Sequence, residues 1–587
     1  MTSWLAPSSR PAFVRRLLLR TRARAALRRT LDLLDRDSRS RRRIDLLRAK
    51  LFSLGFTEEP LADLEAVLRS GRRPLDRALA GRELAVWHLR RGTADGFRDS
   101  LGLVAAARRQ GAPADLRRQL LSVELLALHG LGDAEAGRAA LERAEAAGEV
   151  GVDALLAWSN FQPGPEARVE VINAALARHG IAPLALLPEA PGLPAYDRLA
   201  APGPAPGSAG RDGPRVTVLM AAYEAAATIG TALRSLRAQT WADLEILVLD
   251  DASPTDAMAR VVRAHAAEDP RIRLIRLERN GGAYIARNRG LDEATGELVT
   301  IHDADDWSHP AKIETQARFL LETPRVMGCT SEQARVLDDL SFRKLRGGGG
   351  FVTFNTSSFL FRRAPVREAL GYWDTVRFGA DNELIRRVQR VWGGGAFRKL
   401  PTGPLSFQRD AATSVTGDAV KGIDGGFHYY GVRRDYFDAQ RHHHVHARSL
   451  RYSGRPGERP FGVAPMMLPH PPDPVPRRFD AVFVGEFRLA TPAVLALAAE
   501  IAARRARGEV LGLVEAYDYR LDLPANAGMC AELRALVDGA TVRALVYGEE
   551  AVTARLVPVG RPTPLDRLRF VPRIVVEAEG DAGPAAR

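Results

Sequence analysis

The chain has 587 residues, and its 84 lysine and arginine residues against 71 acidic ones give a formal net charge of +13. At about 150 residues per domain, this length predicts three or four domains. The positive charge fits nucleic acid, an anionic membrane surface or phosphate-bearing substrates, and it fits an arginine-rich coding bias equally well. No apolar run approaches the ~20 residues that span a bilayer, and no RNA- or DNA-binding motif occurs. We therefore expect neither an integral membrane protein nor a nucleic-acid partner.

Cysteine usage and the N-terminal segment bear on the compartment. The only two cysteines, Cys329 and Cys530, lie far apart and have no neighbours at metal-ligand spacing, which favours a reducing cytoplasm. Arginine interrupts the segment from Arg10 to Arg43 too often for a secretory signal. Residues 13–20 could form a basic helix on anionic lipid, although a solvated helix face is the interpretation that we favour. The predicted location is the cytoplasm, with the inner face of the cell membrane as a peripheral alternative.

The N-terminal third is predicted to be helical. Apolar residues recur at three- and four-residue intervals between residue 44 and about residue 185, as in 120–128. Two similar stretches, 84–95 and 125–135, each place a glycine between two helices, about 40 residues apart. This pattern predicts stacked hairpins of the tetratricopeptide kind, and an irregular helical bundle fits nearly as well. We assign residues 1–200 to this helical, repeat-like domain, which is a candidate surface for a protein partner or a membrane.

Two stretches rich in proline divide the rest of the chain. Residues 201–214 read as an interdomain linker of proline, glycine and alanine, and residues 459–478 as a second, proline-rich linker. They separate an α/β domain at 215–420, a helical extension at 421–458, and a small Rossmann-like α/β domain at 479–587. That last domain lacks the G-x-G-x-x-G phosphate loop.

The segment 215–420 alternates predicted strands and helices. The strands are expected at 216–220, 244–251, 272–277 and 298–303, and the helices at 229–237, 257–267 and 284–292. This alternation predicts βαβ units and a mainly parallel sheet. Ligands of such sheets bind beyond the carboxyl ends of the strands, and several acidic residues fall at these ends.

The strongest chemical signal is Asp303-Ala-Asp305 at the end of the fourth strand. Two carboxylates one residue apart can reach one hard divalent cation that also takes phosphate oxygens. The pattern alone is weak, because Asp35-Arg-Asp37 repeats it in a helical region. Its context strengthens it. Asp250-Asp251 ends another strand, where a carboxylate can accept the imide N–H of a uracil-type base, and Tyr223 can stack on a base.

A turn at Asn280-Gly-Gly282 leads into a helix that carries Arg287 and Asn288, and the arginine could face a phosphate. Taken in chain order, these pieces closely resemble the inverting glycosyltransferases of family 2, which have the GT-A fold. The matching segments are 218–224, 249–253, 280–290 and 302–310. The resemblance implies a nucleotide-diphospho-sugar transferase domain whose metal ligands are Asp303 and Asp305, with Mn²⁺ or Mg²⁺ as cofactor. It implies that the nucleotide-sugar donor contacts Ala221, Tyr223, Glu224, Asp250, Asp251, Arg287, Asn288 and Asp303.

The resemblance also suggests the catalytic base. The family's acidic Glu-Asp pair at a helix start corresponds here to Ala380-Asp381, so Asp381 is the preferred base and Glu383 the second choice. Position alone would favour a simple helix cap for Asp381. The family's processive members carry a Gln-x-x-Arg-Trp motif, and this chain has Phe407-Gln-Arg409-Asp at the comparable place. A non-processive enzyme is therefore implied.

The predicted function is inverting transfer of a sugar from a nucleotide-diphosphate sugar, for which we favour a UDP-sugar. The acceptor is a hydroxyl of a glycan, a lipid-linked molecule or a protein, in surface polysaccharide or glycan synthesis. A sugar nucleotidyltransferase is one alternative, against which the loop 221–226 argues because it lacks glycine and basic residues. The other is a binding scaffold with a degenerate transferase core. We expect the histidines at 442–446 to lie on a surface helix rather than to bind a metal, and we do not favour His428 as a third metal ligand. The segment 480–514 faintly resembles half of a GT-B transferase domain and predicts an accessory role.

Overall fold

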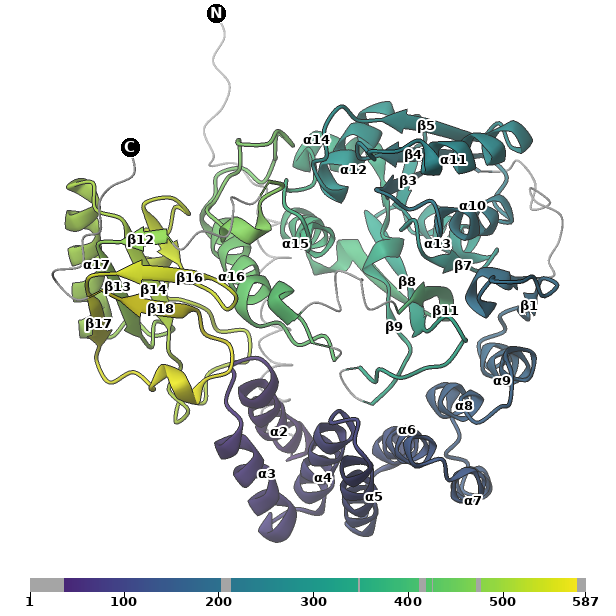
Figure 1. The fold of residues 1–587 in the computed structure, drawn as a ribbon, viewed down its shortest axis with the longest axis horizontal. Helices are drawn as coiled ribbons and strands as arrows, with labels where there is room; N and C mark the ends of the chain where they lie inside the picture. Colours follow the sequence, from purple (N-terminus) through teal and green to yellow (C-terminus); the bar gives the residue numbers. More distant parts are fainter. Residues whose placement is uncertain are drawn as a thin grey trace, which may run out of the picture.

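The computed structural model of the chain describes residues 36–201, 213–346, 349–410, 419–424, 426–470 and 477–577. The predicted lipid-facing segment 13–20, nearly all of the linker 201–214 and the stretch 411–418 lie outside the described residues. The described chain has three parts: a row of helices, a central α/β part and a smaller α/β part (Figure 1). Among these residues, no helix combines the length and the apolarity that a membrane span requires.

The helical part follows an arc in which consecutive helices pack on one another (Figure 1). Its helices are α2 (Arg36–Phe52), α3 (Glu58–Ser70), α4 (Pro74–Leu89), α5 (Ala94–Arg109), α6 (Ala114–Leu131), α7 (Ala134–Ala146), α8 (Val152–Ser159) and α9 (Pro165–Ala177). The similar stretches 84–95 and 125–135 occupy equivalent places, at the ends of α4 and α6 with the following turns. In each turn a side chain caps the next helix: Thr93 accepts from the Gly96 N–H, and Asp133 from the Ala136 N–H. Helical hairpins are thus confirmed over this region.

The central part is built on a nine-stranded sheet. Its first half is parallel and comprises β5 (Ile272–Arg276), β4 (Leu244–Asp250), β3 (Val216–Ala222) and β6 (Leu298–Ile301), in that order. The connecting helices are α10 (Ile229–Arg237), α11 (Ala257–Glu268) and α12 (Ala283–Glu293). Every strand and helix predicted in this half is confirmed to within two residues. The reason is that buried runs of apolar side chains mark β3, β4 and β6, while apolar residues at three of its five positions mark the more exposed β5.

The second half of the sheet corrects the expectation of a mainly parallel arrangement. Strand β10 (Leu360–Arg362) runs antiparallel to both β6 and β8 (Gly328–Val336), and β7 (Trp307–Ser308) antiparallel to β11 (Phe397–Arg409). Only β8 and β11 pair in parallel here, and the short β9 (Thr353–Phe354) pairs antiparallel with β8. The helices of this half are α13 (Lys312–Glu322), α14 (Arg363–Leu370) and α15 (Ala380–Trp392). The sheet is therefore parallel on one side and mixed on the other.

The helical part and the mixed half of the sheet share one hydrophobic core. Residues of α2–α9 pack in the same cluster as Trp307, Phe342 and Phe407. Tyr196 fixes this junction, because its hydroxyl donates to the Phe407 carbonyl at 2.5 Å and accepts the Trp307 N–H at 2.9 Å. The Asn160 side chain pairs in both directions with the Phe342 backbone, at 2.7 and 2.8 Å. The short strands β1 (Ala185–Leu186) and β2 (Leu199–Ala200) lie at this junction.

This shared core predicts the behaviour of a truncated chain. A fragment that begins at Arg211 would expose Trp307, Phe342 and Phe407, each of which contributes roughly 1.5–3 kcal/mol by burial. We expect it to aggregate or to melt at least about 10 °C below the full chain, measured by circular dichroism and size-exclusion chromatography. The full chain, treated in the same way, is the control. A fragment from Arg211 with full-length stability and intact nucleotide binding would contradict this expectation.

The C-terminal part contains two small parallel sheets. One orders β15 (Val542–Ala544), β14 (Leu511–Glu515), β13 (Ala481–Gly485) and β17 (Leu556–Val559), and the other β12 (Arg477–Phe479), β16 (Glu550–Thr553) and β18 (Arg573–Val576). Its helices are α17 (Pro492–Ala506) and the short α18 (Ala531–Arg534). The part touches the beginning of the helical row, where Lys50 pairs with Asp522 at 2.7 Å and the Tyr519 hydroxyl donates to Asp63. Helix α16 (Gly431–His446) connects it to the central part, and α16 is the only α-helix in the described residues of 421–458.

Candidate active site

A cleft of about 540 Å³ lies at the carboxyl ends of the central strands. The parallel register brings these ends together, because Ala222 of β3 pairs with Asp250 of β4 and Leu219 pairs with Ile301 of β6. Seven of the residues predicted from the sequence line the cleft: Ala221, Tyr223, Glu224, Arg287, Asp303, Asp305 and Asp381. Four others, Asp250, Asp251, Asn288 and Glu383, do not line it.

Arg287 of α12 connects the two acidic groups of the cleft. Its Nη2 donates to Oδ1 of Asp303 at 2.7 Å, and its Nη1 donates to both oxygens of Asp381 at 3.1 and 3.2 Å. The Arg287 side chain is only 5% exposed. Burial alone would lower its pKa, but the two carboxylates hold the pKa above the ordinary arginine value. The guanidinium is therefore a permanent cation between two anions, which it keeps close together despite their like charge.

Asp381 lies in the first turn of α15, after Gly379, whose φ of +90° favours glycine. Its carboxylate also accepts from the Tyr284 hydroxyl at 3.0 Å and from the Trp373 indole N–H at 3.1 Å. Among the described residues it caps no helix N–H, so a simple capping role does not account for it. Burial raises the pKa of Asp381 despite the opposing charge of Arg287. This acid is held rigidly and is more basic than an ordinary aspartate.

The loop after β6 places three acids side by side. Asp303 is one-third exposed, whereas Asp306 is buried and accepts the Arg409 N–H at 3.2 Å. Burial and the charge of Asp303 raise the pKa of Asp305 to about 6. Burial and the charges of Asp305 and Asp303 likewise raise the pKa of Asp306. The loop thus crowds three carboxyl groups together in a largely buried place, which disfavours their charged forms.

A hard divalent cation would stabilise the charged forms of these carboxylates. Asp303 and Asp305 supply two carboxylates, and such cations bind through one or two carboxylates together with substrate phosphates. Among the described residues, no cluster of three or more histidine, cysteine or acidic side chains could hold a metal by protein ligands alone. The donor set therefore fits a cation whose remaining ligands come from a phosphate and water.

Asp250, Asp251 and Asn288 have backbone partners of their own. Both oxygens of Asp251 are occupied by the N–H groups of Gly281 and Gly282, at 2.8 and 2.7 Å. Asp250 accepts the Ser253 N–H at 2.9 Å, and the Asn288 side chain pairs in both directions with the Trp373 backbone. The structure does not bring these side chains into the cleft. They instead hold the turn before α12 and the loop that carries the indole donor to Asp381.

Glu383 points away from the cleft into the protein interior. It is fully buried and binds Arg387 at 2.8 Å and His444 at 2.7 Å. Burial by itself would raise its pKa, but Arg387 and His444 together lower the pKa of Glu383 to about 2. The depressed pKa makes the Glu383 carboxylate a poor proton acceptor. Unlike Asp381, Glu383 also does not line the cleft.

The buried pair makes Glu383→Gln a stability variant. We expect a loss of about 3 kcal/mol at pH 7, because Arg387 is left buried without its anion. The folded pKa lies below the unfolded one, so the stabilisation is present above about pH 4.5 and is lost as the pH falls toward 2. The difference between wild type and variant should therefore shrink in urea titrations at pH 3 compared with pH 7. Equal stabilities at pH 7 with lost turnover would instead return Glu383 to the catalytic candidates.

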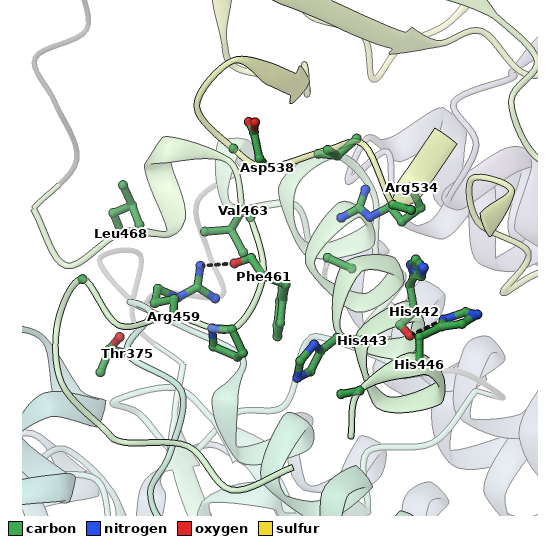
Figure 2. A pocket seen from close by; sticks show the side chains of 18 of the residues that line it. Thr375, His442, His443, His446, Arg459, Phe461, Val463, Leu468, Arg534 and Asp538 are labelled. Atoms are coloured by element: carbon green, nitrogen blue, oxygen red, sulfur yellow. Dashed lines mark hydrogen bonds between the residues drawn. The ribbon is translucent and has the colours of Figure 1, made fainter. Parts of the chain in front are cut away.

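The histidines of 421–458 lie outside the cleft. His444 is buried against Glu383, which corrects the expectation of a purely surface helix at 442–446. His442, His443 and His446 line a separate cavity of about 740 Å³ between α16 and the C-terminal part, together with Arg459 and Arg534 (Figure 2). His428 pairs with Asp424 at 2.9 Å and stacks on Phe52.

Several cleft residues were not predicted. Tyr284 stands one helical turn before Arg287, so helical spacing could have placed both on one face. Trp373, a buried loop residue that donates to Asp381 without lining the cleft, has no comparable sequence signal. Residues from β8, β11, the segment before α16 and α16 itself also line the cleft: Gln333, Arg335, Gln408, Arg409, Ile423, Phe427, Tyr429 and Arg433.

Comparison with known proteins agrees with this geometry. Residues 217–367 match the sequence model of Glycosyl transferase family 2. The uncharacterized glycosyltransferase YibD of Escherichia coli K12 is 38% identical over 108 residues, which cover 18% of this chain and 31% of that protein. The succinoglycan biosynthesis protein ExoO of Rhizobium meliloti is 42% identical over 100 residues, covering 17% and 28%. The chain thus spans about a third of the length of these relatives.

Solved structures give weaker similarity. S. aureus TarS 1–349 in complex with UDP aligns with a TM-score of 0.30 and 15% identity, over 41% of this chain and 67% of that one. The mannosyltransferase PcManGT from Pyrobaculum calidifontis, in complex with GDP-Man and Mn²⁺, aligns with a TM-score of 0.27 and 19% identity, over 50% and 73%.

Proposed function

We propose that this chain, whose residues 217–367 match the model of Glycosyl transferase family 2, has a GT-A domain that transfers a sugar from a nucleotide-diphosphate sugar to an acceptor hydroxyl with inversion. The observation that carries the proposal is the chain of contacts Asp303–Arg287–Asp381 within one cleft. It joins a cation-binding acid to a buried, rigidly held base. A single displacement needs both groups on opposite sides of the reacting carbon.

In this reaction Asp381 removes the proton of the acceptor hydroxyl as its oxygen forms a bond to the anomeric carbon. The bond from that carbon to the diphosphate breaks, and the nucleoside diphosphate leaves from the opposite face. Asp381 already accepts from three donors. The two hydrogen bonds from Arg287 to Asp381 are long and shared between both carboxylate oxygens. An acceptor hydroxyl would therefore replace Arg287, rather than Tyr284 or Trp373, as the donor to Asp381.

Arg287 is placed to move toward the donor. It already touches Asp303, which would lie beside the diphosphate, and a guanidinium binds phosphate oxygens well. A divalent cation held by Asp303 and Asp305 would neutralise negative charge on the departing diphosphate. Tyr223, which is 48% exposed at the rim of the cleft, offers a ring for stacking on the base, for which we propose uracil.

The proposal extends to surface polysaccharide synthesis, to addition of one sugar at a time, and to work at the cytoplasmic face of the membrane. The helical row and the C-terminal part would contact partners or the membrane surface. A scaffold with a degenerate core is the competing function, and it is disfavoured because the acids of the cleft are intact and mutually positioned.

The test is release of nucleoside diphosphate by the full chain from a panel of nucleotide sugars, with Mn²⁺ or Mg²⁺ present. We expect slow hydrolysis of one donor without acceptor and faster release when an acceptor is added. Isothermal titration calorimetry with the same panel separates binding from turnover. Neither binding nor hydrolysis of any nucleotide sugar would favour the scaffold.

A further inference from the structure

One buried side chain in the cleft lacks a hydrogen-bond partner. Gln333 lies near the carboxyl end of β8, is 4% exposed and lines the cleft. Its Oε1 is buried, and no donor among the described residues reaches it. Buried polar groups in folded proteins are nearly always hydrogen-bonded, because an unpaired one has lost its contact with water without replacing it. Gln333 therefore offers hydrogen-bonding capacity that the fold itself does not use.

Two further amides lie on the same side of the cleft. Gln408 of β11 pairs in register with Arg335 of β8, two residues after Gln333, so both glutamines lie on one face of the sheet. The Gln408 amide donates to Oδ1 of Asn355 at 3.4 Å, and Asn355 also lines the cleft. The same Oδ1 accepts the Ser357 N–H at 2.9 Å, which fixes the Asn355 side chain. We call Gln333, Asn355 and Gln408 the amide cluster, which presents uncharged donors and acceptors to the cleft.

The amide cluster lies next to the acidic loop 303–306. In β11, Arg409 follows the cluster directly, and its backbone N–H donates to Asp306 at 3.2 Å. In β8, Arg335 lies two residues beyond Gln333, and its positive charge is near enough to favour the charged forms of Asp305 and Asp306. This loop is where the proposed function places the diphosphate of the donor. The transferred sugar is bonded to that diphosphate, so its ring lies beside the loop.

The segment that carries Asn355 also approaches the proposed base. It continues into the 3₁₀ helix η2 (Thr356–Ser358), which packs against both β6 and α15. Strand β6 leads into the acidic loop, and α15 carries Asp381. In a single displacement the anomeric carbon must lie between the diphosphate and the base. The transferred sugar therefore lies between the two elements that η2 contacts, which places the amide cluster beside it.

We propose that the amide cluster binds the transferred sugar through one of its hydroxyls, and that Gln333 selects the donor by that hydroxyl. A hydroxyl suits this side chain because it can donate to the amide oxygen and accept from the amide nitrogen. A carboxylate or phosphate at this place could not donate to Oε1. The group bound is thus a hydroxyl of a neutral sugar rather than the carboxylate of a uronic acid. This inference rests on the proposed function, since it names the class of donor sugar at the same site.

The experiment uses the full chain with Mn²⁺ and two kinds of probe: the nucleotide sugar that the panel identifies, and its analogues deoxygenated at carbon 3, 4 or 6 of the sugar. Release of nucleoside diphosphate without acceptor gives kcat/KM, and calorimetry gives the affinity. One deoxy analogue should have a kcat/KM at least about 10-fold below that of the parent donor, because it leaves Oε1 buried and unpaired. The other analogues should differ less from the parent.

The variant Gln333→Met assigns the preference to this side chain. Methionine has a similar length and no amide, so the parent donor should fall to the level of the sensitive deoxy analogue, and the ratio of their kcat/KM values should approach 1. Because no described residue bonds to Oε1, this variant should melt at or above the wild-type temperature. Gln162→Met changes a glutamine after α8, outside the cleft, and should keep the full preference.

The outcomes separate this inference from the proposed function. Equal kcat/KM for the parent and all analogues in the wild type, or an equal loss for all of them in Gln333→Met, would overturn the inference alone. So would a preference that appears only with acceptor present, since the hydroxyl would then belong to the acceptor. If calorimetry shows the preference but no sugar is hydrolysed or transferred, the proposed function fails and the inference stands. No binding of any nucleotide sugar would overturn both.

Discussion

Replacing Asp381 with asparagine is expected to lower turnover by about 10²–10⁴-fold, because asparagine cannot take a proton from the acceptor. The substitution keeps the shape of the side chain: its one carbonyl oxygen can still accept from the Trp373 indole, and its amide nitrogen can donate to the Tyr284 hydroxyl, so donor affinity should change little. Steady-state rates at saturating donor and acceptor, with donor binding by calorimetry, measure both quantities.

Glu383→Gln is the matched control for this experiment. It removes another buried acid from the same helix, two residues away, and should reduce stability while turnover at low temperature persists. A variant Asp381→Asn that turns over at near wild-type rate would discard the assignment of the base. A loss of donor affinity equal to the loss of rate would show instead that Asp381 acts by holding Arg287.

The second large effect concerns the cation. Chelation should lower the transfer rate by at least about 100-fold, because the charge of a bound divalent ion contributes several kcal/mol to stabilising the departing diphosphate. Mn²⁺ or Mg²⁺ added back in excess should restore the rate. Asp305→Asn should raise the cation concentration needed for half-maximal activity, since it removes one of the two carboxylates that fit the ion.

The exposed acid Asp256, which pairs with Arg276 beyond β4, offers a control of equal charge change. Asp256→Asn should leave the cation requirement unchanged. Full turnover by metal-stripped protein in excess chelator would show that Arg287 and the neighbouring arginines suffice to stabilise the charge of the departing diphosphate. In that case the crowded acids at 303–306 would need another explanation.

Sequence reasoning predicted the parallel half of the sheet and the acidic residues at its edge of the cleft for a physical reason. In β3 and β4 every side chain except that of Ala221 is buried, so apolar runs mark the strands, and the acids that follow must lie at one edge. Strand β8, Gly-Cys-Thr-Ser-Glu-Gln-Ala-Arg-Val, has no such run, because its polar residues serve the cleft and the sheet pairing. It could be assigned only from its tertiary partners.

The roles of particular acids could not be predicted from the sequence, for a different reason. Asp251 and Asp303 both follow a strand, yet backbone N–H groups occupy both oxygens of Asp251, while Asp303 faces the cleft. That difference depends on how the turn at 280–282 folds back toward β4, which no local pattern encodes. The same holds for the helical row, because its repeat-like spacing predicts hairpins but not that they share a core with Trp307 and Phe407.

The shared core has a consequence for synthesis on the ribosome. The apolar faces of α6 and α8 leave the exit tunnel well before Trp307, Phe342 and Phe407, the residues that cover them. At about 5–20 residues per second, the nascent helices wait on the order of ten seconds or more with these faces uncovered. We expect the nascent chain to engage holding chaperones during this interval, and its soluble yield to fall when they are scarce. In a circular permutant that carries the helical row at the C-terminus, the helices would emerge after the sheet has been synthesised. This permutant should depend less on chaperones.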